Sequence, residues 1–340
     1  MNIAINGFGR IGRATLKSFL SKKSKNKLVA INDLTDINTL VHLLKNDSCY
    51  GQYDKKIKAG KDFIVIGNQK IKVLAEKNPL DLPWKKMKVD IVIECTGRFR
   101  TKKDASLHIK AGAKKVILSA PAKKEIDSKD GKVKTVVMGI NEKSIKKTDQ
   151  IISNASCTTN CYAPITKILH DNFFIERSFM VTVHAVTNDQ RVLDLPHKDL
   201  RRSRSILDNI IPTTSGSDKA TVAVIPSLEG KLHTMAMRVP VKVGSVIYAT
   251  YDLKKKPKIG EINKIIKKAS EKEFKNIIKY ETEPIVSTDI VGSPYSAIFD
   301  SLLTEGDNDL VKIVVWYDNE WGYSSRLVDL IEYISKNKLV

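Results

Sequence analysis

The chain has 340 residues, of which 42% are apolar and 28% charged, a composition typical of a globular protein large enough for two domains. No apolar run approaches the roughly 20 residues that a membrane helix needs, and the first residues lack the features of a signal peptide. Four cysteines are too few for a disulfide scaffold, so we expect a cytoplasmic protein without membrane partners.

The charge of the chain is strongly positive, with 58 basic and 38 acidic residues and a formal net charge of +20. Most of the basic residues are lysines scattered along the sequence, which is typical of a solvated surface. A nucleic-acid groove instead gathers positive charge, often with arginines and stacking aromatic residues, and only 6% of this chain is aromatic. We therefore expect nucleic acid to be at most a secondary, salt-dependent partner.

The first elements form a dinucleotide-binding pattern. A short apolar strand at 2–5 runs into the sequence GFGRIG at 7–12, and apolar residues at helical spacing follow. A second strand, 28–33, ends in Asp33, which lies 21 residues beyond Gly12. The glycines allow the backbone to approach a pyrophosphate, while Asp33 accepts hydrogen bonds from ribose and repels an added phosphate. This pattern predicts NAD binding; the alternative is a glycine-rich turn with an ordinary capping Asp33.

Two later strands support a parallel sheet. The segments 89–94 and 114–118 are apolar on both faces, as buried parallel strands are. Ligands bind at the carboxyl ends of such strands, so Thr96, Gly97 and Ser119 are predicted to border the cofactor site.

The stretch SNASCTTN, 153–160, predicts a reactive cysteine. It follows a strand and opens a helix, which Thr158, Thr159 or Asn160 could cap. Cys157 therefore lies near a helix N-terminus, where the dipole and free N–H groups stabilise a thiolate. Cys161 lies one turn further on and is interpreted as a packed sulfur. The spacing of the two cysteines is not CxxC and no matching pair exists, so no metal site is expected.

A base and several anion ligands follow in the second half. His184 ends an apolar strand, a position that is more often structural when considered alone. The residues around it change that interpretation, since Thr187, the arginines of 191–204, the loop 212–216 and Arg238 are all suited to bind phosphate. Together these features indicate an aldehyde dehydrogenase that acts on a phosphorylated substrate.

These motifs carry a specific resemblance. The sequence resembles the phosphorylating glyceraldehyde-3-phosphate dehydrogenase family over essentially its whole length, in the segments NGFGRIGR (6–13), INDLTD (31–36), TGRF (96–99), SNASCTTN (153–160), TNDQRVLDLPHKDLRR (187–202), IIPTTSG (210–216), MAMRVP (235–240) and WYDNEWGYSSR (316–326). The resemblance implies an α/β fold: a Rossmann-type NAD-binding domain, 1–156, and an α+β catalytic domain with an antiparallel sheet, 157–318. The C-terminal helix, 319–340, would return to the first domain.

The resemblance also implies the reaction and its partners. D-Glyceraldehyde 3-phosphate would be oxidised with NAD and inorganic phosphate to 1,3-bisphosphoglycerate, in glycolysis or gluconeogenesis. Cys157 would form a hemithioacetal and then a thioester, and His184 would take the thiol proton. Such proteins are typically homotetramers, in which the segment around 181–204 reaches toward a neighbour's cofactor.

The resemblance assigns the remaining site residues by motif position. Thr187 and Arg238 would hold the phosphate of the substrate. The attacking phosphate would contact Ser156, Thr158, Arg202, Ser215 and Gly216, although the sequence alone does not decide between Arg201, Arg202 and Arg204. The cofactor would contact Asn6, Gly7, Phe8, Gly9, Arg10, Ile11, Gly12, Asp33, Lys77, Thr96, Gly97, Ser119, Asn319 and Tyr323. Leu195 and Pro196, together with Asp33, favour NAD over NADP.

Four positions and one segment depart from the family pattern, and two rival functions stay open. Lys77 stands where many members have Arg, Ser215 where Thr is usual, Asp218 where Ala is common, and Tyr50 where His is frequent; the segment 239–248 also differs. One rival is an erythrose-4-phosphate dehydrogenase, against which the sequences at 184–191 and 210–216 argue. The other is a basic nucleic-acid-binding or surface-binding protein that has kept the fold, against which the pair of Cys157 and His184 argues.

Overall fold

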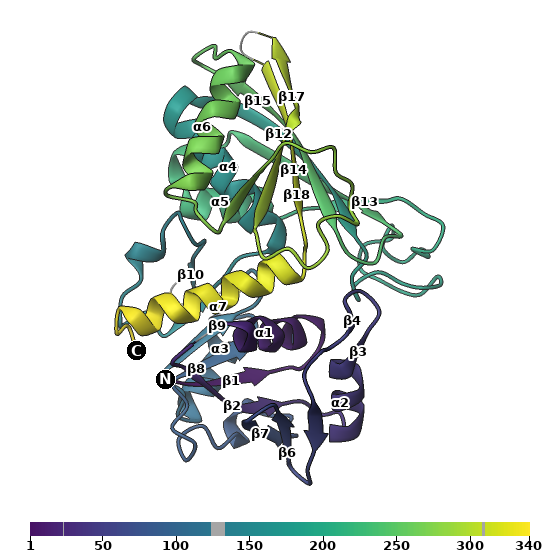
Figure 1. The fold of residues 1–340 in the computed structure, drawn as a ribbon, viewed down its shortest axis with the longest axis vertical. Coiled ribbons are helices and arrows are strands. Elements are labelled where there is room, and N and C mark those ends of the chain that lie inside the picture. Colours follow the sequence, from purple (N-terminus) through teal and green to yellow (C-terminus); the bar gives the residue numbers. More distant parts are fainter. Residues whose placement is uncertain (23, 124–132, 308–309) are drawn as a thin grey trace. The chain divides into compact units, whose positions relative to one another are not determined.

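The computed structural model describes residues 1–22, 24–123, 133–307 and 310–340 (Figure 1). The chain divides into two compact units: the first contains Met1–Val136, Asn141–Ala155 and Ser324–Val340, and the second Val137–Ile140 and Ser156–Tyr323. Among the described helices, none combines the length and the apolar character needed to cross a membrane.

The first unit is built on a nine-stranded sheet. In spatial order its strands are β10 (Lys134–Thr135), β11 (Ile151–Ser153), β9 (Lys115–Leu118), β8 (Ile91–Glu94), β1 (Asn2–Asn6), β2 (Lys27–Asn32), β7 (Gln69–Leu74), β6 (Phe63–Ile66) and β5 (Ile57–Ala59). All neighbours from β10 to β7 pair in parallel, and only β5 and β6 join antiparallel. This parallel core confirms the predicted Rossmann-type fold.

Helices connect and cover these strands. They are α1 (Arg10–Ser21), α2 (Ile37–Lys45), α3 (Lys102–Lys110) and α7 (Trp321–Lys336), with a short pair formed by β3 (Asn46–Asp47) and β4 (Gly51–Gln52). The later part of α7 belongs to the first unit and runs beside α1 (Figure 1). There the hydroxyls of Ser18 and Ser325 lie 3.4 Å apart, and Lys22 pairs with Asp329.

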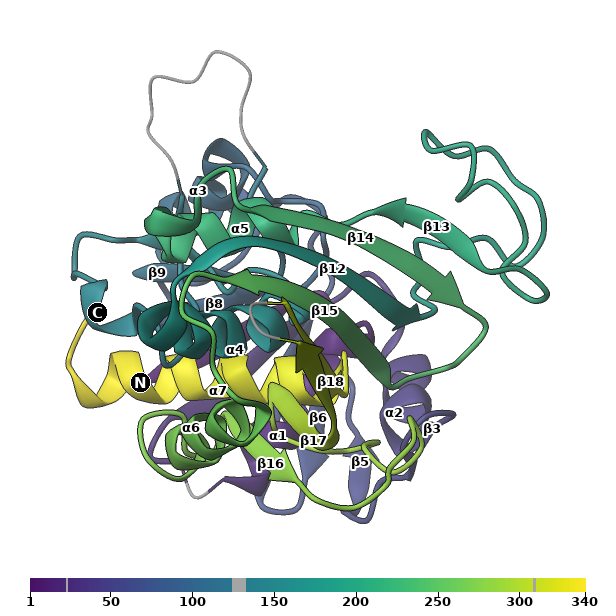
Figure 2. The same cartoon turned by 90° about the horizontal axis from the view of Figure 1, so that it is seen from above.

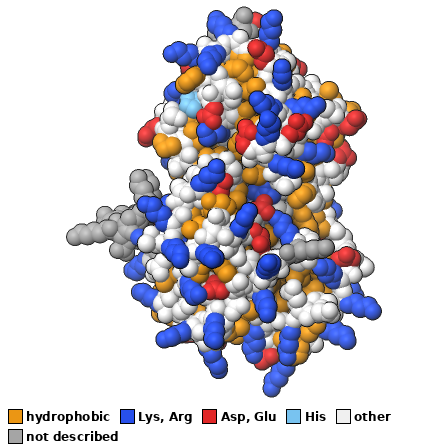
Figure 3. Space-filling model, turned by 60° about the vertical axis from the view of Figure 1, so that its left-hand side comes forward, with side chains coloured by type: hydrophobic (Ala, Val, Ile, Leu, Met, Phe, Trp, Pro, Cys, Tyr) orange, Lys and Arg blue, Asp and Glu red, His pale blue; other side chains and the backbone are white. Residues whose placement is uncertain are grey.

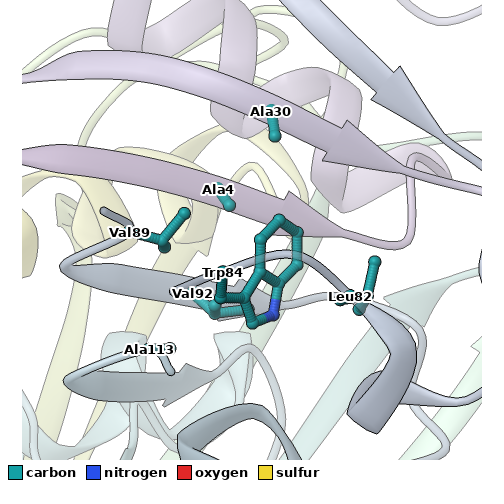
Figure 4. Close-up of a cluster of buried hydrophobic side chains, with 7 residues drawn as sticks. All are labelled: Ala4, Ala30, Leu82, Trp84, Val89, Val92 and Ala113. Carbon is teal, nitrogen blue, oxygen red and sulfur yellow. The ribbon is translucent and has the colours of Figure 1, made fainter. Parts of the chain in front are cut away.

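A compact apolar cluster fills the space beneath β1, β2 and β8. It contains Ala4, Ala30, Leu82, Trp84, Val89, Val92 and Ala113, and Figure 4 shows the indole of Trp84 at its centre. Trp84 is fully buried. The small residues Ala4 and Ala30 on neighbouring strands leave room for the indole.

The second unit has a seven-stranded sheet with helices on one side. In spatial order its strands are β13 (Ile211–Thr214), β14 (Leu232–Val239), β12 (Ile175–Ala185), β15 (Ser245–Leu253), β18 (Leu310–Tyr317), β17 (Ala297–Asp307) and β16 (Ile278–Glu281). The helices α4 (Cys157–Phe173), α5 (Ser217–Val224) and α6 (Ile259–Glu271) lie along the same face (Figures 1 and 2). The sheet is mostly antiparallel, as predicted, with parallel pairs at β12/β14 and β16/β17.

The alternation along β12 determines which face carries His184. Ser178, Met180, Thr182 and His184 are buried, whereas Phe179 is 59% exposed on the opposite face. Because side chains alternate along a strand, the two-residue period places His184 on the same face as Met180. After β12 the chain forms a long connection, 186–210, that extends away from the sheet before β13 begins (Figures 1 and 2).

Candidate active site and cofactor pocket

Cys157 is the first residue of α4. The helix is capped by Ser156, whose hydroxyl accepts the backbone N–H of Thr159 at 3.0 Å, so the cap is not one of the three residues that the sequence suggested. Ala155, just before the cap, has φ 55°, a left-handed conformation that non-glycine residues rarely adopt and that is often found at functional sites.

His184 lies directly beside this cysteine. Its Nε2 is 3.4 Å from the Sγ of Cys157, and its imidazole is 3% exposed. Two groups face the other ring nitrogen, Nδ1: the carbonyl oxygen of Ala185 at 2.7 Å and the Nη1 of Arg238 at 2.6 Å. The carbonyl can only accept and the guanidinium can only donate, so the two groups favour opposite tautomers.

Burial favours the neutral forms of both Cys157 and His184, whereas the charge of Arg238 favours a neutral imidazole but an ionised thiol. Burial, with the positive charge of Arg238 as the second cause, lowers the pKa of His184 to about 3. Burial also raises the pKa of the Cys157 thiol, although Arg238 and hydrogen bonds from Thr158 oppose that rise. At Cys157, burial therefore acts against the stabilisation of a thiolate that the N-terminus of the helix provides.

Tyr317, at the end of β18, completes the surroundings of this pair. Its hydroxyl lies 3.0 Å from the hydroxyl of Thr158 and 2.8 Å from that of Thr182, and its ring meets the edge of His184 at 5.9 Å between centroids. Tyr317 lies in the motif WYDNEWGYSSR, 316–326, but the sequence alone predicts no role for it. Only the pairing of β15 with β18 brings it near α4, and no local pattern shows that.

The residues predicted to bind phosphate lie in different parts of the second unit. Thr187 donates its backbone N–H and its hydroxyl to Gln190. Ser215 and Gly216 precede α5, and no side chain caps that helix. The Nε of Arg238 is buried and has no hydrogen-bond partner among the described residues.

The arginines of the connection 186–210 are not equivalent. Arg202 donates from Nη1 to Asp189 and from Nε to the hydroxyl of Thr213 at 2.7 Å. Arg204 pairs with Asp194 at 3.0 Å on the exposed surface.

At the start of α5, the Oδ1 of Asp218 is shielded from solvent and has no partner among the described residues.

In the first unit, the three glycines of the turn differ in the space around them. A Cβ on Gly7 would lie 2.7 Å from the backbone of Thr96, and one on Gly12 would lie 2.3 Å from the carbonyl oxygen of Gly7. A Cβ on Gly9 would have none of the described atoms within 4 Å, and no side chain caps α1 there. Close packing at Gly12 and open space at Gly9 fit a helix N-terminus that receives a pyrophosphate.

Two adjoining pockets of this unit continue from that turn. One of about 280 Å³ is lined by Asn6, Gly7, Gly9, Asn32, Asp33, Leu34, Glu76, Lys77, Cys95, Thr96, Arg98 and Phe99. The other, of about 560 Å³, shares Glu76, Lys77, Arg98 and Phe99 with it and adds Asn78, Pro79, Asp81 and Asp104. The four shared residues make the two pockets continuous beside the glycine turn.

Asp33 connects the pocket to the glycine turn. Its Oδ2 accepts the backbone N–H of Phe8 at 2.7 Å and its Oδ1 that of Thr35 at 3.0 Å. The carboxylate therefore accepts backbone N–H groups and also lines the smaller pocket, while its predicted contact with ribose stays a prediction. Nearby, Arg10 pairs with Asp47 at 2.7 Å and its guanidinium lies over the ring of Tyr50.

Other predicted cofactor residues lie at strand or helix ends. The N–H of Ser119 bonds to the carbonyl of Glu94 at 3.0 Å, and Gly97 has φ 70°. In the second unit, Asn319 is buried and its Oδ1 accepts from the N–H of Gly244 and the hydroxyl of Ser245, both at 3.1 Å. Tyr323 lies two residues into α7. Asn32, Arg98 and Phe99 line the smaller pocket as well, although the sequence did not predict them as site residues.

The positive charge does not form a groove on the face that Figure 3 shows. Lys and Arg side chains are spread over that face and are interrupted by acidic and uncharged groups. This distribution matches the scattered lysines of the sequence.

Comparison with known proteins gives a single result over the whole chain. The family model for the glyceraldehyde 3-phosphate dehydrogenase NAD binding domain matches residues 1–102, and the model for the C-terminal domain of the same enzyme matches residues 156–319. The chain is 50% identical to a glyceraldehyde-3-phosphate dehydrogenase of Geobacillus stearothermophilus, over 100% of this chain and 99% of that one. It is also 50% identical to one of Borreliella burgdorferi, over 99% and 100% of the two chains, and 48% identical to one of Streptomyces avermitilis, over 98% of both.

Proposed function

The chain belongs to the glyceraldehyde-3-phosphate dehydrogenase family, and on that premise we propose how its residues divide the work of the reaction. The protein is an NAD-dependent oxidoreductase that acts on glyceraldehyde 3-phosphate. The observation that supports the residue roles best is the 3.4 Å separation between the Sγ of Cys157 and the Nε2 of His184 at the start of α4.

Cys157 is the nucleophile in this proposal. Its sulfur attacks the aldehyde carbon while the thiol proton moves to Nε2 of His184, giving a hemithioacetal. Nε2 can accept that proton only in the tautomer that carries a proton on Nδ1, which the carbonyl of Ala185 at 2.7 Å favours and the Nη1 of Arg238 at 2.6 Å opposes. Backbone N–H groups at the start of α4 are placed to stabilise the developing oxyanion.

NAD supplies the acceptor for the hydride that the hemithioacetal loses. In the proposal the glycine turn binds the pyrophosphate over Gly9, where no described side chain or backbone atom intervenes. Asp33 receives the ribose hydroxyls, and Lys77 lines both pockets beside it. The other cofactor contacts are assigned to Asn6, Gly7, Phe8, Arg10, Ile11, Gly12, Thr96, Gly97, Ser119, Asn319 and Tyr323.

Arg238 and Thr187 bind the phosphate of the substrate in this proposal. The buried Nε of Arg238, which has no partner among the described residues, supports that role because a guanidinium pairs well with a phosphate. Binding there would also draw positive charge away from His184 Nδ1, since the phosphate competes with the imidazole for the guanidinium.

Inorganic phosphate then attacks the thioester and releases 1,3-bisphosphoglycerate. We assign its site to Ser156, Thr158, Arg202, Ser215 and Gly216. At the start of α5 the N–H groups of Ser217 and Asp218 donate to the hydroxyls of Ser215 and Thr234, both at 3.3 Å, and a bound phosphate would compete for these N–H groups. Arg202 has to exchange Asp189 for the phosphate, whereas Arg204 is exposed and paired with Asp194.

The domain division is proposed as the sequence suggested it. Residues 1–156, together with the helix of 319–340, form the NAD-binding domain, and 157–318 form the catalytic domain. A catalytic thiol works only when reduced, so the proposal places the enzyme in a reducing, cytoplasmic compartment.

A homotetramer is proposed as the working form. On the face of the second sheet opposite its helices, Phe179, Met235 and Tyr248 are exposed by 59%, 36% and 47%. In the connection 186–210, Leu193 and Leu200 are exposed by 71% and 81%. Such apolar surface supports burial against further copies of the chain, which light scattering of the purified protein would test.

The reaction is tested by NADH formation with glyceraldehyde 3-phosphate, NAD and phosphate. We expect wild type to require phosphate or arsenate, Cys157→Ser to be inactive, and Cys161→Ser, which removes a buried sulfur one turn deeper in α4, to stay active. NADH formation without phosphate or arsenate would contradict the thioester step. Absence of NADH from wild type would contradict the assigned substrate.

A further inference from the structure

A network of buried, hydrogen-bonded polar side chains lies in the first unit next to the smaller pocket, and it has no role in the proposed reaction. Trp84 and His108 are both 0% exposed, and Glu94 and Asn6 are both 2% exposed. They come from four separate segments of the sequence: the turn before β8, helix α3, and the strands β8 and β1. Buried polar groups of this kind are retained only when each has a partner, so their connections can be followed atom by atom.

The first connection fixes the tautomer of His108. The indole Nε1 of Trp84 lies 3.0 Å from Nδ1 of His108, and an indole N–H can only donate. Nδ1 must therefore accept, which leaves the proton of a neutral imidazole on Nε2. That nitrogen faces Oε2 of Glu94 at 3.1 Å and donates to it. The proton is thus located by the chemistry of its neighbours.

Glu94 connects His108 to residues that line the pocket. Its Oε2 also accepts from Nδ2 of Asn6 at 2.5 Å, and its Oε1 accepts from the backbone N–H of Thr96 at 2.7 Å and from the hydroxyl of Thr96. Oδ1 of Asn6 in turn accepts from Nδ2 of Asn32 at 2.7 Å. Asn32 then bonds to both the N–H and the carbonyl of Glu76.

The residues at the end of this hydrogen-bond network line the smaller pocket. Asn6, Asn32, Glu76 and Thr96 all line the pocket of about 280 Å³. Phe99, which lines the same pocket, meets the ring of His108 edge-on at 6.2 Å between centroids. His108 itself is not among the lining residues, so it acts on the pocket through its contacts with Glu94, Phe99 and Asn6, whose Nδ2 lies 3.4 Å from its Nε2.

We propose that His108 is a positioning residue for the NAD pocket. Trp84 fixes His108 as the tautomer with its proton on Nε2, and this N–H holds the side chain of Glu94 in one rotamer. In that rotamer Glu94 orients the side chain of Asn6 and the backbone turn at Thr96. The proposal rests on NAD as the ligand of this pocket and is independent of the chemistry at Cys157. Removing the donor leaves Nδ2 of Asn6 as the remaining donor to Oε2 of this buried carboxylate, so Glu94 is held less firmly and the turn it holds loosens.

The test compares His108→Leu with His108→Gln. Leu removes both ring nitrogens, whereas the amide of Gln can still donate to Glu94 from nearly the same place. The dissociation constant of NADH, followed by its own fluorescence without substrate, is expected to rise about tenfold for His108→Leu and less than about threefold for His108→Gln. The KM for NAD should rise in parallel while kcat at saturating NAD changes less than about twofold.

Two further variants separate positioning from folding. Val89→Ala removes packing from the cluster around Trp84 and should lower the melting temperature without moving the NADH dissociation constant. Trp84→Phe keeps an aromatic ring but frees the tautomer of His108, and should weaken NADH binding about threefold even if His108→Leu fails to fold. In the cofactor-free protein, hydrogen exchange of the Thr96 amide should quicken in the His108→Leu and Trp84→Phe variants.

The outcomes decide the proposal without any turnover. It is overturned if His108→Gln binds NADH as poorly as His108→Leu, if Val89→Ala weakens NADH binding as much as they do, or if Trp84→Phe leaves both NADH binding and Thr96 exchange unchanged. A wild-type protein that binds NADH but forms none would contradict the proposed reaction and leave this inference standing.

Discussion

The Nη1 of Arg238 lies 2.6 Å from Nδ1 of His184, on the opposite side of the imidazole from the sulfur of Cys157. The guanidinium therefore opposes a positive charge on the ring, while an imidazolium is what proton transfer from the thiol produces. A substrate phosphate that engages Arg238 would remove this opposition. The positive charge that binds the substrate would then also govern when the thiol is activated.

The first prediction concerns the reactivity of Cys157. Because burial raises the pKa of this thiol and lowers that of His184 to about 3, both groups are neutral at pH 7 in the substrate-free enzyme. The rate of alkylation by iodoacetamide should therefore rise about tenfold per pH unit from pH 7 to 9 without reaching a plateau. Mass spectrometry of the labelled peptide distinguishes Cys157 from Cys161. A plateau below pH 7 would show that the thiolate already exists in the resting site.

The second prediction concerns stability in acid. The folded pKa of His184, about 3, lies below the ordinary value of 6.5, so between these values the unfolded chain binds more protons and stability falls as the pH falls. One such group lowers the free energy of unfolding by about 2 kcal/mol between pH 7 and pH 5. His184→Asn should lose less stability over that interval, by about this amount, in urea titrations at one protein concentration. Equal losses for both proteins would contradict the prediction.

The third prediction concerns Arg238. Arg238→Gln removes a largely buried donor for the substrate's phosphate and should lower kcat/KM for glyceraldehyde 3-phosphate by about 30-fold to 100-fold. Arg177→Gln, which breaks an exposed pair with Asp252 in the same unit, serves as the matched control and should change kcat/KM by less than about twofold. If the two variants behave alike in initial-rate assays, Arg238 does not bind the substrate.

The fourth prediction concerns the choice of cofactor. Asp33→Ser removes the carboxylate that repels a phosphate on the adenosine ribose, so the ratio of kcat/KM for NAD to that for NADP should fall at least about tenfold. Asp36→Ala is the control, because Asp36 caps α2 through the N–H groups of Asn38 and Thr39 and does not line either pocket. An unchanged ratio in Asp33→Ser would exclude the role given to this carboxylate.

Local patterns in the sequence were sufficient to predict the elements that carry the site. The glycine turn at 7–12 and the helix that begins at Cys157 could be predicted because glycine geometry and helix capping act within a few residues. The partnership of Cys157 with His184 came from chemical types and a family resemblance, since 27 residues separate them.

The parts of the site that were missed depend on contacts between distant segments. Trp84, Glu94 and His108 each look ordinary in the sequence, and only the packing of α3 near β8 makes them a chain of hydrogen bonds. The opposing effect of burial on the ionisation of this pair could not be predicted for a related reason. Helix position can be predicted from sequence, but the burial of His184 and the approach of Arg238 follow from the pairing of β12 with β14.

Within the turn at 7–12, Gly12 and Gly9 differ in whether the fold leaves space for a side chain. A methyl group on Gly12 would collide with the Gly7 carbonyl at 2.3 Å, so the chain itself forbids it. A methyl group on Gly9 would meet no described atom within 4 Å, so folding places no steric bar on it. In the proposal the added methyl group of Gly9→Ala occupies the space of the NAD pyrophosphate, so this variant should fold but not bind NAD. The folding and assembly of the protein could then be studied apart from cofactor occupancy.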